Sequence, residues 1–478
     1  MKLSRALCLL TLLLFAAPLQ AAPPPNILFI MADDLGWADL AGYGADLHET
    51  PHLDRLARQG MRFTDAYAAA PVCSPTRSSI MTGKFPARLH ITIWYEGALQ
   101  RPQNRALIPP QPTANLPHSE ITIAEALKAA GYFTAHVGKW HLGDAAFYPE
   151  TQGFDVNIGG TFWGAPSTFF YPYRGKWGNT EEVRYVPHLE FGKDGEFLTD
   201  RLTDEAMNVI DRAADRPFFL NLWYHNPHTP IEAKPALVEH YQKKLKPGLN
   251  HQNAAYAAMI HSLDENIGRL MAKLEQKGLA DRTVVIFTSD NGGFINDYKG
   301  AKVTSNAPLR SGKGSLYEGG LRVPLLIRWP GVVKPGAECR APVVSHDFYP
   351  TLLELAGTKG DARHNQSVDG LSLVPLLKNP RATLARDTLY FHYPHYYPTT
   401  SPVSALRSGD WKLLEYHEDQ RLELFNLKND LGEATNLAAR QPDQAQVLRA
   451  KLHAWRQAVG AQMPEPNPDF KSKQGKKK

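Results

Sequence analysis

Two pairs of oxygen-bearing side chains directly follow apolar segments that the sequence predicts to be strands. Asp33 and Asp34 follow the segment NILFIMA, and Asp290 and Asn291 follow the segment TVVIFTS. In an open α/β sheet, ligands bind beyond the carboxyl ends of the strands, so we expect these side chains to meet at one edge. Because all four offer only oxygen ligands, they favour Ca²⁺, with Mg²⁺ as the second choice, over Zn²⁺.

Basic side chains follow two other predicted strands. Lys139 and His141 come after the segment YFTAHVG, and His225 and His228 lie at the end of PFFLNLWYHNPH. One histidine or one DD pair has an ordinary structural explanation, whereas four strands that deliver such groups to one edge indicate a site. A hard cation beside a ring of basic groups suits the binding and cleavage of a sulfate or phosphate ester. The expected ring consists of Arg77, Lys139, His141, His228 and Lys313.

Cys73 lies in the segment PVCSPTRSS, which predicts the start of a helix. Pro75 suits a first helical turn, so Cys73 would lie at the helix N-terminus, where backbone N–H groups favour an anion. A lone cysteine is by default a small buried apolar residue, and a thiolate is a poor ligand for a hard cation. Oxidised to an aldehyde and hydrated, the same carbon would carry two hydroxyls, one to bind metal and attack and one to release product.

Capped helices separate the predicted strands. Residues 50–60 have a threonine N-cap, a proline at the first helical position and a glycine past the end. Residues 122–131 have capping-box spacing and a closing glycine, and residues 251–278 have one apolar face. Strands that alternate with helices predict an α/β fold with a large mixed, mostly parallel sheet sandwiched by helices.

The predicted pattern of secondary structure changes near residue 385. Short alternating strands with tight turns follow, and then the helical pattern QPDQAQVLRAKLHAWRQAV. We therefore predict a catalytic α/β domain over 22–384, a C-terminal α+β subdomain with an antiparallel sheet and a helix over 385–465, and a disordered basic tail over 466–478.

Residues 1–21 have a basic start, an apolar stretch too short for a membrane span and a small-residue exit near Ala21. This pattern is typical of a secretory signal peptide and predicts a periplasmic or secreted protein without stable membrane insertion. The mature chain keeps Cys73 and Cys339, which an exported protein could join as one disulfide.

The positive charge of the chain belongs to its two ends. Removing Lys2 and Arg5 lowers the formal net charge from +5 to +3, and removing the five lysines of the last eight residues as well lowers it to −2. A basic tail on a slightly acidic body argues against a nucleic-acid-binding fold.

Several motifs together resemble the type I, formylglycine-dependent sulfatase family of the alkaline phosphatase superfamily. CSPTR at 73–77 matches the motif C-x-P-x-R, in which the cysteine becomes formylglycine, and GKWHLG at 138–143 is similar to the second motif of the family. Four further segments look like the other landmarks of the family in the same order, over roughly residues 26–380: ADDLGW, NPHTP, SDNGG and GKGSLYEGGLRVP.

The resemblance implies an arylsulfatase-like sulfuric ester hydrolase that a formylglycine-forming enzyme matures. Arg77 and Lys139 would hold the formylglycine and the sulfate. His141 would contact the non-attacking hydroxyl and help to expel sulfate, while His228 and Lys313 would grip the sulfate and assist the leaving oxygen. His225 receives no role. The implied Ca²⁺ ligands are Asp33, Asp34, the modified Cys73, Asp290 and Asn291.

The sequence leaves the substrate open. A phosphate or phosphonate monoester hydrolase of the same superfamily is the nearest alternative, and an inactive saccharide-binding protein is another. Export and the aromatic-rich loops at 161–178 and 391–398 suit a sulfated saccharide, although such rings could equally pack the two domains together. The resemblance is closest to exo-acting bacterial carbohydrate sulfatases, including those for galactose- or N-acetylgalactosamine-type sugars.

Overall fold

This computed structural model describes residues 24–99, 104–213 and 215–471. The predicted signal peptide (1–21) and the last seven residues of the predicted tail lie outside the described residues. Within the described ranges, no helix combines the length and the apolar character that crossing a membrane requires.

In the described part of the chain, a nine-stranded sheet forms the centre of the molecule, in the order β13-β2-β12-β9-β1-β8-β4-β5 with β14 beside β2. Every neighbouring pair is parallel except the two pairs of β12, which is antiparallel to both β2 and β9. The predicted mixed, mostly parallel sheet is confirmed. Its strands are β1 (Asn26–Ala32), β2 (Met61–Tyr67), β4 (Phe133–Gly138), β5 (Val156–Ile158), β8 (Phe218–Trp223), β9 (Thr283–Ser289), β12 (Arg322–Arg328), β13 (Ala337–Cys339) and β14 (Val343–Val344).

The direction of the strands decides where the functional residues meet. β1, β4, β8 and β9 run the same way, so the residues that follow each of them lie at one edge of the sheet. Because β12 runs the opposite way, the segment that precedes it, which includes Lys313, reaches that same edge.

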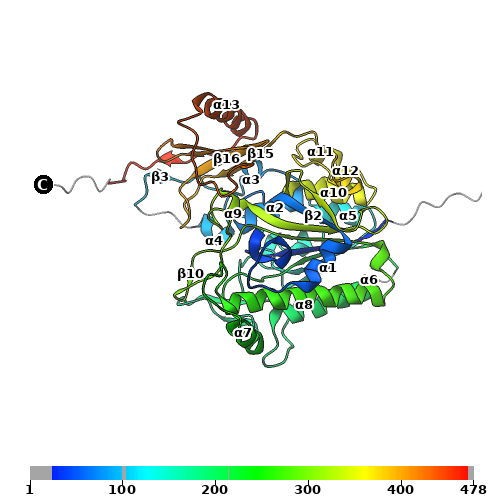
Figure 1. The fold of residues 1–478 in the computed structure, drawn as a ribbon. Helices are drawn as coiled ribbons and strands as arrows, with labels where there is room; N and C mark the ends of the chain where they lie inside the picture. The colour runs from blue at the N-terminus through cyan, green and yellow to red at the C-terminus, as the bar shows by residue number, and fades with distance from the viewer. Residues whose placement is uncertain (1–23, 100–103, 214, 472–478) are drawn as a thin grey trace, which may run out of the picture.

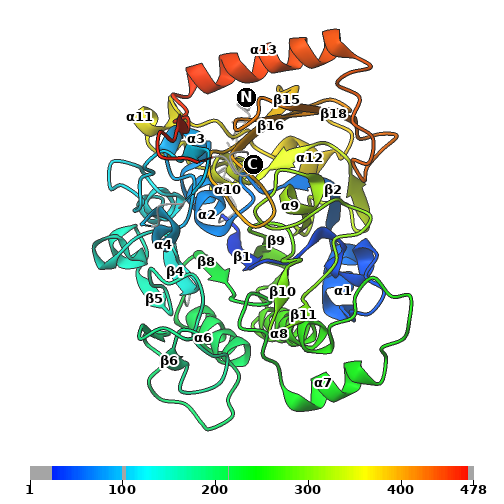
Figure 2. The same cartoon turned by 90° about the vertical axis from the view of Figure 1, so that its left-hand side faces the viewer.

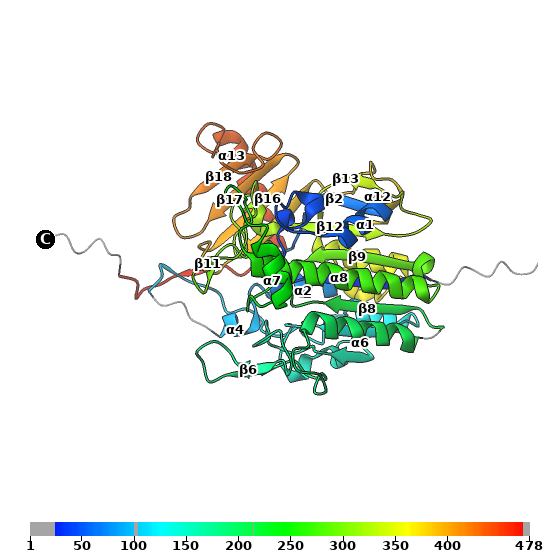
Figure 3. The ribbon, with the colours of Figure 1, turned by 60° about the horizontal axis from the view of Figure 1, so that its bottom comes forward.

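Helices cover both faces of the sheet (Figure 1). Successive side chains of a strand point to opposite faces, so Leu28 and Ile30 pack in one apolar core and Phe29 and Met31 in the other. Figure 3 shows α6 and α8 beside each other on the first face. This face carries α1 (Pro51–Gln59), α6 (Leu198–Ala213) and α8 (Ala254–Gln276), and the other carries α2 (Cys73–Thr82), α5 (Ile123–Ala129), α10 (Phe348–Leu355) and α12 (Val374–Lys378).

The predicted capping box of α5 is present, and Thr50 is the N-cap residue of α1 as predicted, but its side chain does not cap the helix. The Thr50 hydroxyl accepts a hydrogen bond from the N–H of Ala41 instead of capping α1. The carboxylate of Asp264, from α8, accepts the first free N–H groups of α1, at His52 (3.0 Å) and Leu53 (2.8 Å). The free N–H groups at the start of α1 therefore find their acceptor in a side chain that is distant in the sequence. The local sequence could not predict this contact.

A separate antiparallel sheet lies beside the central one and confirms the predicted C-terminal sheet and helix. It contains β15 (Thr388–Tyr393), β16 (Val403–Ser408), β17 (Trp411–Tyr416) and β18 (Leu422–Asn426). Helix α13 (Pro442–Ala458) covers it through an apolar cluster that includes Leu452 and Trp455 (Figure 2). The domain boundary at 384 and 385 stays a prediction.

The first residues of the predicted tail contact the folded protein. β19 (Glu465–Pro466) pairs with β3 (Leu107–Ile108), and the N–H of Asn467 donates to the carbonyl of Ala106 at 2.9 Å. The remaining short elements are α3 (Pro86–Leu89), α4 (Tyr95–Ala98), α7 (Pro235–Gln242), α9 (Glu318–Leu321), α11 (Ala362–Asn365), β6 (Arg174–Lys176), β7 (Val183–Tyr185), β10 (Asp297–Tyr298) and β11 (Ala301–Lys302).

Candidate active site

The predicted acidic residues meet at the carboxyl edge of the central sheet. Asp33 and Asp34 follow β1, Asp290 and Asn291 follow β9, and all four are buried. The Asn291 amide donates to Asp34 Oδ1 at 2.8 Å, and the backbone N–H of Asp34 donates to Asp290 Oδ1 at 3.2 Å. Cys73 Sγ lies 3.6 Å from Asp33 Oδ1. Residues that are far apart in the sequence thus form one compact set of ligand atoms.

Two buried cations pair with two of the carboxylates. Lys139 Nζ lies 2.9 and 2.7 Å from the two oxygens of Asp33. Arg77 donates from Nε and Nη2 to one oxygen of Asp290, at 3.0 and 2.7 Å, and from Nη1 to the carbonyl of Lys139 at 2.9 Å. Arg77 therefore connects α2 to the residues that follow β4 and β9.

Lys313 and His228 form a second polar group at the same edge. Lys313 Nζ lies 2.9 Å from Asp34 Oδ2 and 3.0 Å from His228 Nε2. The other ring nitrogen of His228, Nδ1, donates to the carbonyl of Thr229 at 2.7 Å. Since an ammonium only donates, His228 Nε2 accepts from Lys313, and the imidazole is neutral in this arrangement.

Burial and neighbouring charges perturb the titration of the site. Burial raises the pKa of Asp33 to about 8 despite the nearby Lys139. Burial would also raise the pKa of Asp290, but Arg77 and Lys139 lower it below its usual value. Burial raises the pKa of the Cys73 thiol to about 12, so an unmodified Cys73 is a neutral thiol at neutral pH.

The oxygen-rich part of the site fits a hard divalent cation. Asn291 Oδ1 is buried and has no hydrogen-bond partner among the described residues, although its amide nitrogen is paired. Three buried carboxylates lie beside it, and carboxylate and amide oxygens are the ligands that Ca²⁺ and Mg²⁺ take in proteins. Ligand atoms of Asp33, Asp34, Cys73 and His228 also lie within 4.8 Å of one another.

Cys73 is the first residue of α2, as the sequence predicts, and its side chain is buried. Gly83, with φ 72°, ends this helix in the left-handed region. Cys73 and Cys339 are both free thiols, so they form no disulfide in this structure.

Cys73, His141, His228 and Lys313 all line one cavity of about 270 Å³. Its other walls come from residues to which sequence reasoning gave no individual role. Gly164, Ala165, Trp177 and Tyr397 belong to the aromatic-rich loops noted in the sequence, but nothing in the local pattern identified Trp94, Glu96 or Arg184 as parts of the site. These added wall residues are Trp94, Glu96, Gly164, Ala165, Trp177, Arg184 and Tyr397.

His225 does not line this cavity. It is buried, and neither of its ring nitrogens has a hydrogen-bond partner among the described residues. Burial, together with the nearby Lys139 and Arg77, lowers the pKa of His225 well below its ordinary value. Its neighbour His228 faces the cavity instead.

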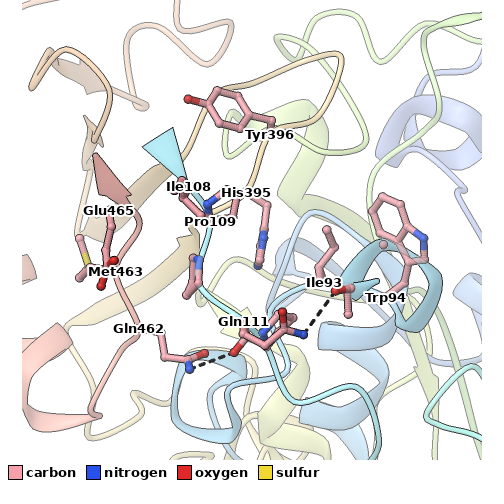
Figure 4. Close-up of a pocket in the computed structure, with 14 residues that line it drawn as sticks. Ile93, Trp94, Ile108, Pro109, Gln111, His395, Tyr396, Gln462, Met463 and Glu465 are labelled. Atoms are coloured by element: carbon pink, nitrogen blue, oxygen red, sulfur yellow. Dashed lines mark hydrogen bonds between the residues drawn. The ribbon is translucent and has the colours of Figure 1, made fainter. Parts of the chain in front are cut away.

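A second cavity of about 650 Å³ shares Trp94 with the first. Figure 4 shows the residues that line it. Its lining residues come from four segments, at 93–98, 108–112, 395–396 and 462–465. Proline, isoleucine and aromatic side chains line it together with amide groups such as that of Gln111. None of the predicted catalytic residues is among the residues that line this larger cavity.

Comparisons with known proteins agree with this arrangement. A family model described as Sulfatase matches residues 25–358, and one described as N-sulphoglucosamine sulphohydrolase, C-terminal, matches residues 312–459. The chain is 34% identical to a Sulfatase of Formosa agariphila, over 91% of this chain and 89% of that protein. It is 35% identical to the N-acetylgalactosamine-6-sulfatase of Homo sapiens, over 81% and 74%. The crystal structure of Ps i-CgsB in complex with k-i-k-neocarrahexaose superimposes with a TM-score of 0.75, at 30% identity over 91% of this chain and 93% of that one.

Proposed function

This chain belongs to the sulfatase family of sulfuric ester hydrolases, and we propose that it is exported and removes sulfate from a saccharide. One observation carries the proposal: the cavity that ends at Cys73 brings together His141, His228 and Lys313 beside a buried carboxylate cluster. These are the groups needed to hold a sulfate, to move protons and to neutralise a departing oxygen.

Cys73 is proposed to be converted to formylglycine by a maturation enzyme. The high pKa of the thiol supports this, because a neutral buried thiol is a poor nucleophile and a poor ligand for a hard cation. In hydrated form, formylglycine would supply one hydroxyl to attack sulfur, which breaks the bond from sulfur to the leaving oxygen. A second hydroxyl would lose its proton as the bond from carbon to the sulfate oxygen breaks and the aldehyde re-forms. Arg77 and Lys139 orient the surrounding carboxylates, and Lys313 offers a cation to the sulfate oxygens.

Ca²⁺, with Mg²⁺ as the second choice, is the proposed metal, and position 73 would complete its shell. The metal would neutralise negative charge on the sulfate as a Lewis acid. The unpaired buried oxygen of Asn291 and the oxygen-only donor set support this assignment. The proposed protein ligands are Asp33, Asp34, Asp290 and Asn291.

We propose a galactose- or N-acetylgalactosamine-type sugar as the sulfated residue. The wall of the first cavity offers the rings of Trp94, Trp177 and Tyr397 for stacking against a sugar. The second cavity offers room for further sugar units on the leaving-group side. Two relatives support the class of substrate: one is named for N-acetylgalactosamine 6-sulfate chemistry, and another was solved with a neocarrahexaose.

The test combines peptide mass analysis with kinetics on matched substrates. We expect the peptide that contains Cys73 to carry formylglycine in active protein, and Cys73→Ala to abolish turnover. Cys339→Ala is the matched control, because it removes the other buried thiol without touching the site. Full activity with an unmodified Cys73 would contradict the mechanism. Faster turnover of a phosphate or phosphonate ester than of the matched sulfate ester would favour the alternative hydrolase.

A further inference from the structure

Glu96 contacts the proposed proton acceptor of the site. It lies in α4, and its Oε2 is 2.9 Å from His141 Nε2. Its other oxygen, Oε1, accepts from the N–H of Gly164 at 3.4 Å and lies 3.5 Å from Arg184 Nη2. The carboxylate is thus held from three sides, with its side chain 21% exposed.

The ionised carboxylate of Glu96 determines which tautomer His141 adopts. An ionised carboxylate only accepts hydrogen bonds, so Nε2 of His141 must carry a proton. Burial alone would raise the pKa of Glu96, but His141 and Arg184 lower it to about 2, which keeps the carboxylate ionised at neutral pH. The other ring nitrogen, Nδ1, is buried without a hydrogen-bond partner among the described residues. A neutral His141 therefore keeps a free lone pair on Nδ1.

The position of the imidazole is constrained as well as its tautomer. A methyl group at Gly164 would lie 2.4 Å from Cε1 of His141, so the ring packs directly on this glycine. The hydroxyl of Ser74 donates to the carbonyl of His141 at 2.6 Å, which connects the histidine to the first turn of α2. His141 and Cys73 line the same cavity.

We infer that Glu96 is a positioning residue that sets His141 as a proton acceptor toward position 73. This inference rests on the proposed function, because the proton comes from a hydroxyl carried by residue 73. The O–H bond breaks, its electron pair stays on oxygen, and the proton binds Nδ1 of His141. Glu96 then faces the imidazolium across the Nε2–H bond and stabilises its charge, as a carboxylate does for a histidine base in other hydrolases.

Glu96→Gln tests this, with Glu182→Gln as the matched control. Glu182 also pairs with Arg184, at 2.5 Å from its Nε, but has no contact with His141. A glutamine at 96 can donate as well as accept, so it permits the wrong tautomer. We expect kcat for a sulfate ester to fall about 10²-fold, the lower end of the contribution of general acid–base catalysis, with KM within about twofold. Glu182→Gln should retain kcat.

A second readout does not depend on turnover. In histidine-selective ¹⁵N NMR spectra of the unmodified protein, His141, identified by its loss in His141→Gln, should show a protonated Nε2 and an unprotonated Nδ1. Glu96→Gln should change that pattern, and Glu182→Gln should not. An unchanged pattern, or equal losses of kcat in both variants, would overturn the inference. If the unsubstituted protein contains formylglycine but turns over no sulfate ester, the proposed function fails, and the NMR comparison still decides whether Glu96 sets the tautomer.

Discussion

Arg77 and Asp290 form a buried pair in which two nitrogens of the guanidinium donate to the same carboxylate oxygen. The second oxygen of Asp290 accepts the N–H of Asp34, at 3.2 Å. Asp290 therefore has a structural role besides its proposed role as a metal ligand. Both side chains of the pair are fully buried, so removing one leaves an uncompensated charge.

Asp290→Ala should abolish turnover and also lower the free energy of unfolding by about 3–5 kcal/mol, the usual cost of breaking a buried ion pair. Asp290→Asn preserves the shape and should lose turnover with a smaller loss of stability. Urea unfolding and sulfate-ester kinetics on both variants would check this. A fully active, fully stable Asp290→Ala would contradict both roles of the residue.

Much of this site was predictable because parallel strands bring their carboxyl ends to one edge. Asp33 and Asp290 each follow a continuous apolar segment, and the strand pattern alone places them together. Cys73 was predictable because Pro75 marks the first turn of α2. These positions depend on local sequence and sheet direction only.

The walls of the cavity could not be predicted in the same way. Glu96 lies in a four-residue helix, and Arg184 lies in a three-residue strand, neither of which has a clear period in the sequence. Tyr397 follows β15 of the C-terminal sheet and reaches the cavity only because that sheet packs beside the central one. Such contacts depend on tertiary packing, as does the cap that Asp264 provides to α1.

Removing the metal should lower both activity and stability. A cation that binds only the folded protein adds about 2.7 kcal/mol to the free energy of unfolding at one hundred times its Kd. We expect elemental analysis to find Ca²⁺, or Mg²⁺, and EGTA or EDTA treatment to lower the Tm. Asp33→Asn should reduce the metal content and the chelator effect together. Stoichiometric Zn²⁺ would contradict the assignment of the ligands.

Buried histidines should make the protein less stable in acid, and His136 offers a single-residue test. It lies in β4, and burial lowers the pKa of His136 to about 3 from the ordinary histidine pKa of about 6.5. At a pH between these two pKa values, His136 binds a proton in the unfolded chain but stays neutral in the folded chain. The free energy of unfolding should therefore decrease as pH falls below about 6.5, by up to about 1.4 kcal/mol per pH unit for this group.

His136→Gln should remove that share of the pH dependence between pH 6 and pH 4, as urea unfolding at each pH would measure. His118→Gln is the control for the loss of an imidazole, because His118 is exposed. Identical slopes for all three proteins would show that His136 does not contribute.

Among the C-terminal residues, those that line the second cavity should affect kcat/KM for large substrates but not for small ones. Deleting residues 472–478 removes four of the tail lysines and should leave turnover of nitrophenyl sulfate and of a sulfated oligosaccharide unchanged. Deleting residues 463–478 also removes Met463 and Glu465 from the wall of the second cavity and the pairing of β19 with β3. That deletion should lower kcat/KM for the oligosaccharide only. Equal losses on both substrates would exclude a role of the second cavity in binding the leaving-group sugar.

His228 should matter according to the leaving group. As the S–O bond breaks, negative charge builds on the departing oxygen, which a nitrophenolate carries by itself and a sugar alkoxide does not. Nδ1 of His228 donates to the carbonyl of Thr229, and the unprotonated Nε2 accepts from the Lys313 ammonium. His228 can therefore deliver a proton from Nε2 only after Lys313 has transferred one to it.

His228→Ala should therefore slow saccharide sulfates about 10²-fold more than nitrophenyl sulfate, on the scale of general acid catalysis. His225→Ala is the matched control, since this buried neighbour does not line the cavity and its loss should affect both substrates equally. If His228→Ala also slows both substrates by the same factor, His228 holds the sulfate group. Lys313, whose Nζ lies 2.9 Å from Asp34, is then the group that assists the leaving oxygen.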